Sequence, residues 1–488
     1  MIRSLPLALV LADPAAAQGP AAAAPGAKAV QRLNRAPVSK DVLKVKLPRP
    51  EIKTLPNGLT VMVVEQHKLP VVTMSLWIKS GALSDPKELP GLAKFTAELL
   101  REGTASRSSR QLASSVDELG ATLEASAAFG SGVTGVSASG LVEDTDRLLE
   151  LMADVTRNAT FPADELEKYK KRELAELEQM RSNPQFLGRE RFFAALYKDA
   201  APARIAATVA SVQAATPERL RAFRDEHYVP GNVILGVAGD VTLARILPMV
   251  EQRFGDWKGT APKAWTGVEP EAAKTRVLLI DRPDSVQTEI LAGNLAMKRT
   301  SPDFIKLTVA NRVLGGGPSA RLFLQLREEK GYTYGAYSGF SADVYTGPFS
   351  ARLAVRNEVT EPAIRDLLAE FDKIRKEPVP EAELDDARRA IVASYALSLE
   401  RPATLLNLWM SARYYGLSED YWDRYAEEVA RTTPAQVQEA ATRYVDPAHL
   451  QLVLVGDAKV IGKLAGQFGP VEVYDVDGKR KDLVDKTP

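Results

Sequence analysis

The sequence contains no cysteine, and only three of its 488 residues are histidine. Without a thiol, the chain cannot form disulfides, cysteine-ligated zinc or iron–sulfur sites, or a cysteine nucleophile. Three histidines also leave little for a histidine-rich metal site or for a histidine-based catalytic triad. These two scarcities exclude more classes of function than any other feature of the composition.

Neither sign of charge is in excess, because 63 Lys and Arg residues balance 63 Asp and Glu residues. Proteins that bind nucleic acid or membrane surfaces need a concentrated excess of basic side chains, and no basic run occurs here. No apolar run approaches the roughly 20 residues that a bilayer-spanning helix needs. With 45% hydrophobic residues, the composition is that of a globular protein of about two to four domains.

The first 17 residues have the pattern of a secretory signal peptide. Arg3 provides a positive charge, Leu5 to Ala12 form a short apolar core, and Ala15 to Ala17 provide a small-residue cleavage site. The alternative reading is a flexible arm rich in Ala and Pro. Residues 18–45 are rich in Ala, Pro and Gly, so we expect a disordered leader there and an exported protein.

Strand and helix patterns alternate after the leader without the regular βαβ series of a parallel sheet. Residues 59–64 and 71–79 are rich in β-forming residues, and the apolar spacing indicates helices over 91–102, 144–156 and 164–181. The sequence therefore predicts an α+β fold.

The chain repeats a long pattern. Thr216-Pro217 opens a predicted helix that leads to a strand ending at Gly239-Asp240, and Thr433-Pro434 opens another that leads to Gly456-Asp457. Both the start and the end of the pattern recur 217 residues later. A repeat of this length indicates an internal duplication.

The duplication predicts the domain organisation. We expect an N-terminal domain over residues 46–254 and a C-terminal domain of the same fold over residues 275–488. Residues 255–274 contain Pro262 and Pro270 and lack periodicity, which is typical of a surface linker. Two similar halves joined in this way can close on each other like a clamshell, and ligand sites favour such domain interfaces.

Several short motifs occur in order along nearly the whole chain after residue 45. They include Asn57-Gly58-Leu59, Gly91-Leu92-Ala93, Gly103-Thr104, Gly239-Asp240 and Gly315 to Phe323. In their order and spacing these motifs resemble the pitrilysin, insulysin and mitochondrial processing peptidase family, the inverzincins. The resemblance implies two homologous α+β domains that enclose a chamber in which peptides are cleaved, in agreement with the duplication.

The catalytic signature of that family is H-x-x-E-H on a helix, in which two His bind zinc and the Glu activates water. Aligned through Gly91-Leu92-Ala93 and Gly103-Thr104, these positions hold Lys94, Ala97 and Glu98. A protonated Lys cannot ligate zinc, Ala has no base, and a single carboxylate leaves the site short of three protein ligands. We therefore predict no catalytic zinc in this chain, and an ion pair between Lys94 and Glu98 one helical turn apart.

A segment of the C-terminal half, Leu326 to Tyr334, resembles the second functional segment of the family. Its Arg and Tyr, seven residues apart, are here Arg327 and Tyr334, and the resemblance implies that they reach across the chamber. A guanidinium can hold a peptide carbonyl, and a phenol can donate to the oxyanion of a tetrahedral intermediate. The simpler reading pairs Arg327 with a nearby Glu on an exposed helix and leaves Tyr334 half-buried.

A chain without the zinc motif but with this Arg and Tyr resembles the complementary subunit of a bacterial two-subunit inverzincin. The resemblance implies a heterodimer with a homologous subunit that bears H-x-x-E-H and zinc, peptide substrates, and a periplasmic location. This chain itself is expected to hold no cofactor and to bind neither nucleic acid nor membrane. Residues 120–133 resemble the family's peptide-binding edge strand, but Glu124 stands where Asn is common, so we expect the partner's edge strand to bind the peptide.

There are two alternative functions beside the two-subunit peptidase. The first is an inert member of the fold that acts as a peptide-binding or structural assembly protein, a role that needs neither Arg327 nor Tyr334. The second is a self-contained peptidase with a metal among Glu98, Glu176 and His67. It lacks an evident general base. The family's downstream Glu ligand aligns near Ala175 or Glu176.

Other motifs are weak. Residues 135–140 miss the G-x-S-x-G nucleophile elbow by one residue and are predicted to be strand. Residues 315–317 lack the Lys of a phosphate-binding loop and are predicted to be a helix-capping turn.

Overall fold

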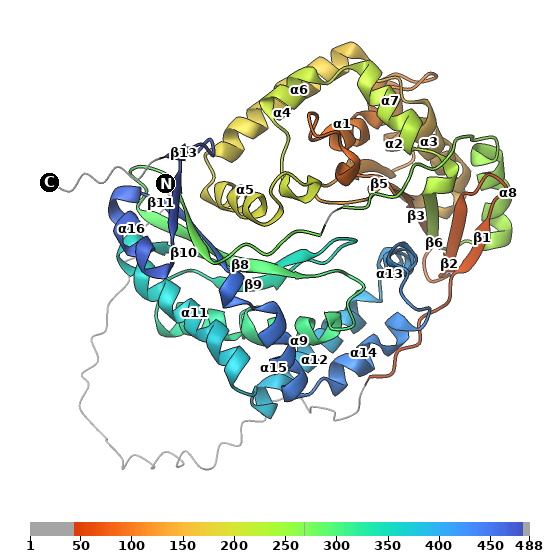
Figure 1. Ribbon diagram of the computed structural model, residues 1–488. Helices are drawn as coiled ribbons and strands as arrows, with labels where there is room; N and C mark the ends of the chain where they lie inside the picture. Colours follow the sequence, from red (N-terminus) through yellow and green to blue (C-terminus); the bar gives the residue numbers. More distant parts are fainter. Residues whose placement is uncertain (1–42, 268, 482–488) are drawn as a thin grey trace, which may run out of the picture. The chain divides into compact units, whose positions relative to one another are not determined.

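The computed structural model of the chain describes residues 43–267 and 269–481, and two β-sheets organise them (Figure 1). The first sheet has the strand order β1-β2-β6-β3-β5-β4, and the second has the order β13-β12-β7-β11-β8-β10-β9. The predicted signal peptide lies outside the described residues, as does the predicted leader up to residue 42.

The first half of the chain forms one sheet with helices between its strands. Its strands are β1 Glu51–Thr54, β2 Thr60–Glu65, β3 Val71–Ile78, β4 Thr122–Ala127, β5 Thr134–Leu141 and β6 Val233–Gly239. Its helices are α1 Leu92–Glu98, α2 Ser109–Glu118, α3 Thr145–Asn158, α4 Ala163–Arg181, α5 Pro184–Tyr197, α6 Val209–Ala214, α7 Pro217–His227 and α8 Leu243–Phe254.

The second half repeats this plan. Its strands are β7 Arg276–Asp281, β8 Gln287–Met297, β9 Ala336–Phe340, β10 Gly347–Arg356, β11 Gln451–Gly456, β12 Val471–Tyr474 and β13 Arg480–Lys481. Its helices are α9 Phe304–Leu314, α10 Arg321–Phe323, α11 Thr360–Lys376, α12 Glu381–Ser398, α13 Pro402–Tyr415, α14 Tyr421–Arg431, α15 Pro434–Tyr444 and α16 Ala458–Ala465.

The two sheets share one topology. Strands β2, β6, β3, β5 and β4 of the first sheet lie in the same order as β7, β11, β8, β10 and β9 of the second. In both sheets the first two of these strands are parallel, and each later neighbour is antiparallel. This correspondence confirms the predicted α+β fold with two homologous halves.

One helix of each half packs on the sheet of the other half (Figure 1). Helix α5 contacts β7, β8 and β11, whereas α13 contacts β2, β3 and β6. Phe192 of α5 belongs to the same buried apolar cluster as Leu291 of β8, and Leu406 of α13 is buried against the first sheet. The helices begin at Pro184 and Pro402, 218 residues apart, so the exchange follows the duplication. Burial of apolar surface on both sheets therefore holds the two halves together.

The predicted elements largely agree with the observed ones. Strands β2 and β3 and helices α3 and α4 appear where the sequence patterns place them, and residues 135–140 lie in β5. The first predicted helix, 91–102, is wrong at its end, because α1 stops at Glu98 and a 3₁₀ turn follows over Leu99–Arg101. Leu99 and Leu100 are both buried, so apolar spacing continues through a turn that is wound more tightly than an α-helix.

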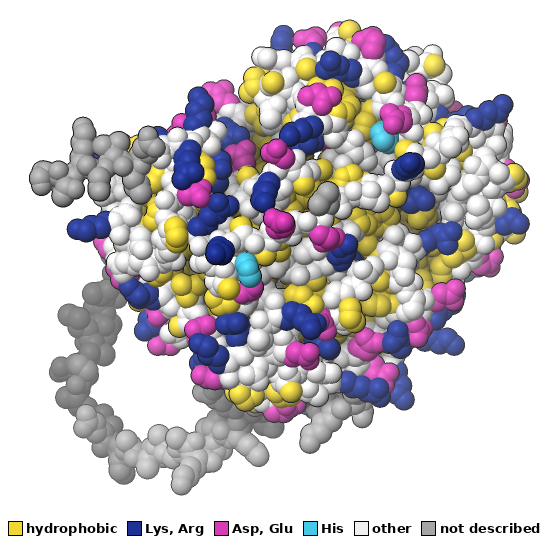
Figure 2. Space-filling model, viewed as in Figure 1, with side chains coloured by type: hydrophobic (Ala, Val, Ile, Leu, Met, Phe, Trp, Pro, Cys, Tyr) yellow, Lys and Arg dark blue, Asp and Glu magenta, His cyan; other side chains and the backbone are white. Residues whose placement is uncertain are grey.

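The segment between the halves, residues 255–267 and 269–274, contains no helix or strand. This suits the predicted linker, while the exact domain boundaries stay predictions. Within the described part of the chain, no helix has the length and apolar character needed to cross a membrane. On the face shown in Figure 2, basic and acidic side chains are interspersed.

Candidate functional site

Helix α1, where the sequence places the predicted degenerate zinc motif, is fixed at its start by Asp85. One carboxylate oxygen accepts the backbone N–H of Gly91 at 2.7 Å, and the other accepts that of Ala93 at 2.8 Å. Gly91 has a φ of 99°, in the region that favours glycine. Burial raises the pKa of Asp85 to about 6. A buried carboxyl thus holds the first turn of the helix that presents Lys94.

Lys94 extends from α1 towards α4. Its ammonium forms an ion pair with Glu173 and lies 3.7 Å from Oε2 of Glu98 and 3.4 Å from the hydroxyl of Tyr169. The side chain of Glu173 is only 3% exposed, and a buried carboxylate is costly unless it is paired. The predicted contact between Lys94 and Glu98 is confirmed, whereas the sequence did not reveal that Glu173 is the main partner.

The carboxylate of α4 that meets Lys94 is Glu173, and neither Ala175 nor Glu176, near which the family's downstream Glu was predicted to fall, lies at this contact. Ala175 and Glu176 are exposed on α4, whereas Glu173 is buried and turned towards α1. The buried face of α4 carries Tyr169, Glu173 and Leu177 at a spacing of four residues. One sequence signal could have identified Glu173: it lies in the apolar stripe of a helix whose other faces are charged.

The arrangement of Lys94, Glu98 and Glu173 is an ion triad with no hydrolytic group. Ala97 is fully buried and offers no base to activate water. Burial and the neighbouring Glu98 and Glu173 charges raise the pKa of Tyr169, which keeps this phenol neutral. Across the described ranges, no group of three or more His, Asp or Glu side chains is arranged to hold a metal ion.

His67, the histidine of the self-contained alternative, is engaged elsewhere. Its Nδ1 lies 2.6 Å from a carboxylate oxygen of Asp240, and its Nε2 lies 3.4 Å from Glu65. Hydrogen bonds to Asp240 and then Glu65 raise its pKa. Glu98 pairs with Lys94, and Glu176 is exposed. The three proposed ligands of that alternative therefore have separate surroundings.

In the second half, Arg327 and Tyr334 differ in their surroundings. Arg327 lies in a π-helical turn, Leu324–Glu329, a rare form that often occurs at functional sites. Its guanidinium forms an ion pair with Glu328 and lies 4.9 Å from the ring centroid of Phe323. Tyr334 is 92% exposed. The simpler reading is correct for the Arg–Glu pair and wrong for a half-buried Tyr334, whose phenol faces solvent.

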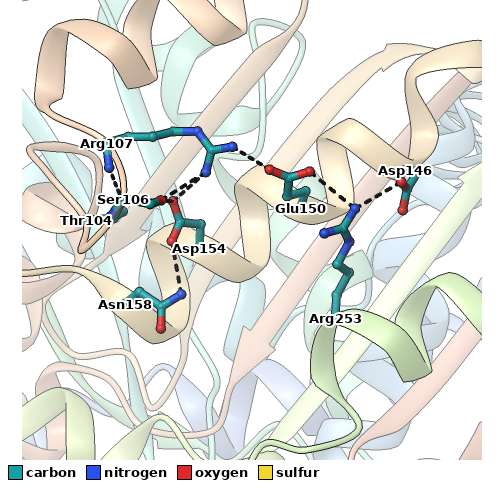
Figure 3. Close-up of polar contacts among 8 residues, drawn as sticks. All are labelled: Thr104, Ser106, Arg107, Asp146, Glu150, Asp154, Asn158 and Arg253. Carbon is teal, nitrogen blue, oxygen red and sulfur yellow. Dashed lines mark hydrogen bonds and ion pairs between the residues drawn. The ribbon is translucent and has the colours of Figure 1, made fainter.

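The loop that follows α1 is tied to α3 by one carboxylate (Figure 3). Asp154 accepts hydrogen bonds from Thr104 at 2.8 Å, Ser106 at 3.0 Å, Arg107 at 2.8 Å and Asn158 at 3.0 Å. Burial acts to raise the pKa of Asp154, but these hydrogen bonds outweigh it and lower that pKa. The Gly103-Thr104 motif therefore has a structural role in anchoring this loop.

The same network reaches α8. Glu150 of α3 pairs with Arg107 on one side and with Arg253 of α8, at 3.2 Å, on the other. Arg253 also contacts Asp146 at 3.0 Å, as Figure 3 shows. Both arginines of this network have acidic partners, so we interpret the network as a structural link between the loop, α3 and α8.

Strand β4 forms one edge of the first sheet and, among the strands that the structure describes, pairs only with β5. Helix α1 packs against β4, so the edge lies beside the helix of Lys94. An edge strand offers backbone groups to which an extended peptide can add. Glu124 is exposed on this edge and places a negative charge there.

Two adjoining segments of the chain match known family descriptions. Residues 60–208 match the family described as "Insulinase (Peptidase family M16)". Residues 214–391 match the description "Peptidase M16 inactive domain". The first match contains the position of the zinc motif, and the second contains Arg327 and Tyr334.

Relatives over most of the chain carry the name zinc protease. An uncharacterized zinc protease of Mycobacterium leprae is 27% identical over 424 residues, which cover 85% of this chain and 92% of the relative. One from Bacillus subtilis is 26% identical and covers 71% of this chain and 84% of that protein.

Two solved structures have a similar fold. A peptidase M16 inactive domain from Pseudomonas fluorescens has a TM-score of 0.78 and 28% identity, covering 84% of this chain and 98% of that chain. A protease from Helicobacter pylori has a TM-score of 0.77 at 19% identity, covering 84% of this chain and all of the other.

Proposed function

The chain belongs to the M16 peptidase family, and we propose that it is the zinc-lacking subunit of a two-subunit zinc peptidase that degrades peptides. The observation that carries this proposal is an asymmetry between the two halves. The position of the zinc motif is filled by Lys94 paired with Glu173, while Tyr334 in the other half is 92% exposed. A subunit that only closes a chamber has no use for an exposed phenol at this position.

In the proposed complex, a homologous subunit with H-x-x-E-H would hold the zinc, and the metal would supply Lewis-acid chemistry to the scissile carbonyl and to water. Arg327 holds a peptide carbonyl or carboxylate through its planar donors. Its pair with Glu328 is exposed, and exposed pairs contribute little, so substrate can replace Glu328 at small cost. Tyr334 donates its hydroxyl proton in a hydrogen bond to the oxyanion of the tetrahedral intermediate.

The proposal also covers where the peptide binds and where the complex is located in the cell. The peptide adds to the edge strand of the partner, because Glu124 places a carboxylate on the corresponding edge of this chain. The signal pattern in residues 1–17 supports export to the periplasm, where short or unfolded peptides are the substrates.

The test begins with the tagged chain purified from its own cells, with mass-spectrometric identification of the proteins that accompany it. We expect a stoichiometric chain bearing H-x-x-E-H and a peptide-cleaving activity that a chelator abolishes. Tyr334→Phe and Arg327→Ala are expected to lower kcat by about 10²-fold or more, with the complex and its zinc content unchanged. Tyr332→Phe is the matched control, because this neighbouring ring packs on the core of the second half.

The second candidate is an inert peptide-binding or assembly protein of the same fold, supported by the missing base at Ala97. It predicts recovery of the chain alone, or within an unrelated assembly, with no cleavage. Unchanged turnover of the Arg327 and Tyr334 variants within an active complex would remove these residues from the mechanism.

A further inference from the structure

Glu289 is a buried carboxylate in the second half that the proposed chemistry does not use. It lies on β8 and is 7% exposed, and it lines a cavity of about 290 Å³ together with Gln185, Arg352 and Tyr334. The charge of Arg352 lowers the pKa of Glu289 through space, without an ion pair between the two side chains. Among the described residues, the Glu289 carboxylate has neither an ion pair nor a hydrogen bond of its own.

The strands around Glu289 explain why it has no partner. It lies opposite Ala354 of β10 and Val455 of β11, and neither of these side chains can donate a hydrogen bond. It shares a face of β8 with Leu291, which packs in the cluster that contains α5. Burial raises the pKa of Glu289 to about 7. The charged form of a carboxyl in such surroundings is costly, so the group either takes up a proton or pairs with a cation that enters the cavity.

We infer that this cavity, the Glu289 pocket, binds a cationic nitrogen of a peptide, either the side chain of a Lys or Arg residue or the α-ammonium of the amino terminus. The carboxylate supplies the negative charge, and Gln185 at the start of α5 supplies a polar wall. The cavity volume of about 290 Å³ is just below the range of about 300–1,000 Å³ for small-molecule sites, which suits one side chain.

The location of the pocket links it to the proposed function, on which this inference rests. Tyr334, proposed to contact the reacting carbonyl, lines the same cavity. A peptide whose carbonyl lies at Tyr334 would therefore place a neighbouring side chain or its amino terminus within reach of Glu289. The pocket then selects among peptides by charge, while the edge strand of the partner binds the backbone.

Arg352 is the competing cation. It is exposed on β10 opposite Leu291, and it makes no ion pair with Glu289 within the described part of the chain. Its charge opposes the entry of a second cation, so its removal is expected to strengthen binding. If Arg352 instead turned inward in solution and paired with Glu289, the pocket would be closed to peptides.

The experiment uses the purified full chain and fluorescently labelled decapeptides that differ at one position, Lys against norleucine, each with a free or acetylated amino terminus. Fluorescence anisotropy gives Kd. We expect the cationic peptide to bind about tenfold more tightly than its neutral match. Glu289→Gln is expected to remove this preference and leave the affinity of the neutral, acetylated peptide unchanged. Arg352→Gln is expected to increase the preference for the cationic peptide. Glu358→Gln, at an exposed position, is the control.

Each outcome decides the inference. A preference that follows Lys identifies a side-chain pocket, and one that follows the free amino terminus identifies an α-ammonium site. Equal affinities, no binding, or a preference that survives both Glu289→Gln and the pocket-filling variant Glu289→Met would overturn it. The measurement needs neither partner nor cleavage. If the chain prefers cationic peptides but no peptide-cleaving complex is found, the pocket is supported and the proposed function is refuted. If a complex cleaves peptides and Glu289→Gln does not change the cleavage, the proposed function is supported and the pocket is refuted.

Discussion

The ammonium of Lys94 forms an ion pair with the carboxylate of Glu173 across the gap between α1 and α4. The sequence comparison predicts that Lys94, on α1, stands at the first His position of the family's zinc motif. A side-chain cation therefore balances the carboxylates of Glu98 and Glu173.

Substitution of Lys94 is expected to lower the free energy of unfolding. Lys94→Met leaves Glu173 buried without a counter-charge, and loss of one partner of a buried pair typically costs about 3–5 kcal/mol. We expect the free energy of unfolding, measured by urea denaturation, to fall by about 3 kcal/mol. Glu98→Gln is the control, since Glu98 is 33% exposed and should cost less than about 1 kcal/mol. Equal losses in the two variants would contradict the ion-triad interpretation.

The same geometry predicts that a metal site can be restored. The triple variant Lys94→His, Ala97→Glu, Glu98→His places two imidazoles on one helix face, with Glu173 as the third ligand. We expect one zinc per chain after dialysis, measured by atomic mass spectrometry, where the parent chain retains none under the same conditions. Addition of Glu173→Gln should abolish retention of the metal. Zinc that persists without Glu173 would show that this residue does not occupy the ligand position.

Two of the three histidines, His227 and His67, are predicted to contribute to the pH dependence of stability with opposite signs. Burial lowers the pKa of His227, whose Nδ1 lies 3.1 Å from the Ser80 hydroxyl. The unfolded chain then takes up a proton near pH 6.5, before the folded chain does. Stability from this residue is therefore complete above about pH 6.5 and is lost as the pH falls.

For His67 the sign is opposite, because its pKa is raised. Its contribution is present below about pH 6.5 and is lost as the pH rises through the folded pKa. Since the chain has three histidines, their ring signals can be followed one by one in an NMR titration. We expect His67 to titrate above and His227 below the ordinary value, and His227→Gln to reduce the loss of stability between pH 7 and 5. A His227 signal that titrates at the ordinary value would contradict the burial argument.

The exchange of helices depends on a glycine. A Cβ at Gly236 of β6 would lie 2.5 Å from the Met410 sulfur and 2.6 Å from a methyl carbon of Leu406, both in α13. We expect Gly236→Ala to lower the free energy of unfolding by about 1–3 kcal/mol, because α13 must shift from the sheet. Gly135→Ala on β5 is the matched control, since its Cβ would meet nothing within 4 Å. If both variants unfold alike, α13 does not pack closely on this strand.

Much of the fold was predictable because its signals are local or periodic. The recurrence of Thr216-Pro217 at Thr433-Pro434 predicted two halves, and matching sheet orders confirm them. The end of α1 was mispredicted, since the apolar spacing is the same for an α-helix and for the 3₁₀ turn that follows it. The exchange of α5 and α13 left no sequence signal, because an apolar helix face does not specify which sheet it covers.

The sequence by itself determined that this chain contains no H-x-x-E-H motif, since no two of its three histidines are four residues apart. It also determined the order of the motifs that indicate the family. Only the tertiary structure decided that Glu173 rather than Glu176 meets Lys94, and that Glu289 and Tyr334 line one cavity. Such pairings join residues far apart in the chain, and the packing of whole helices and strands fixes them, which spacing along a single segment cannot express.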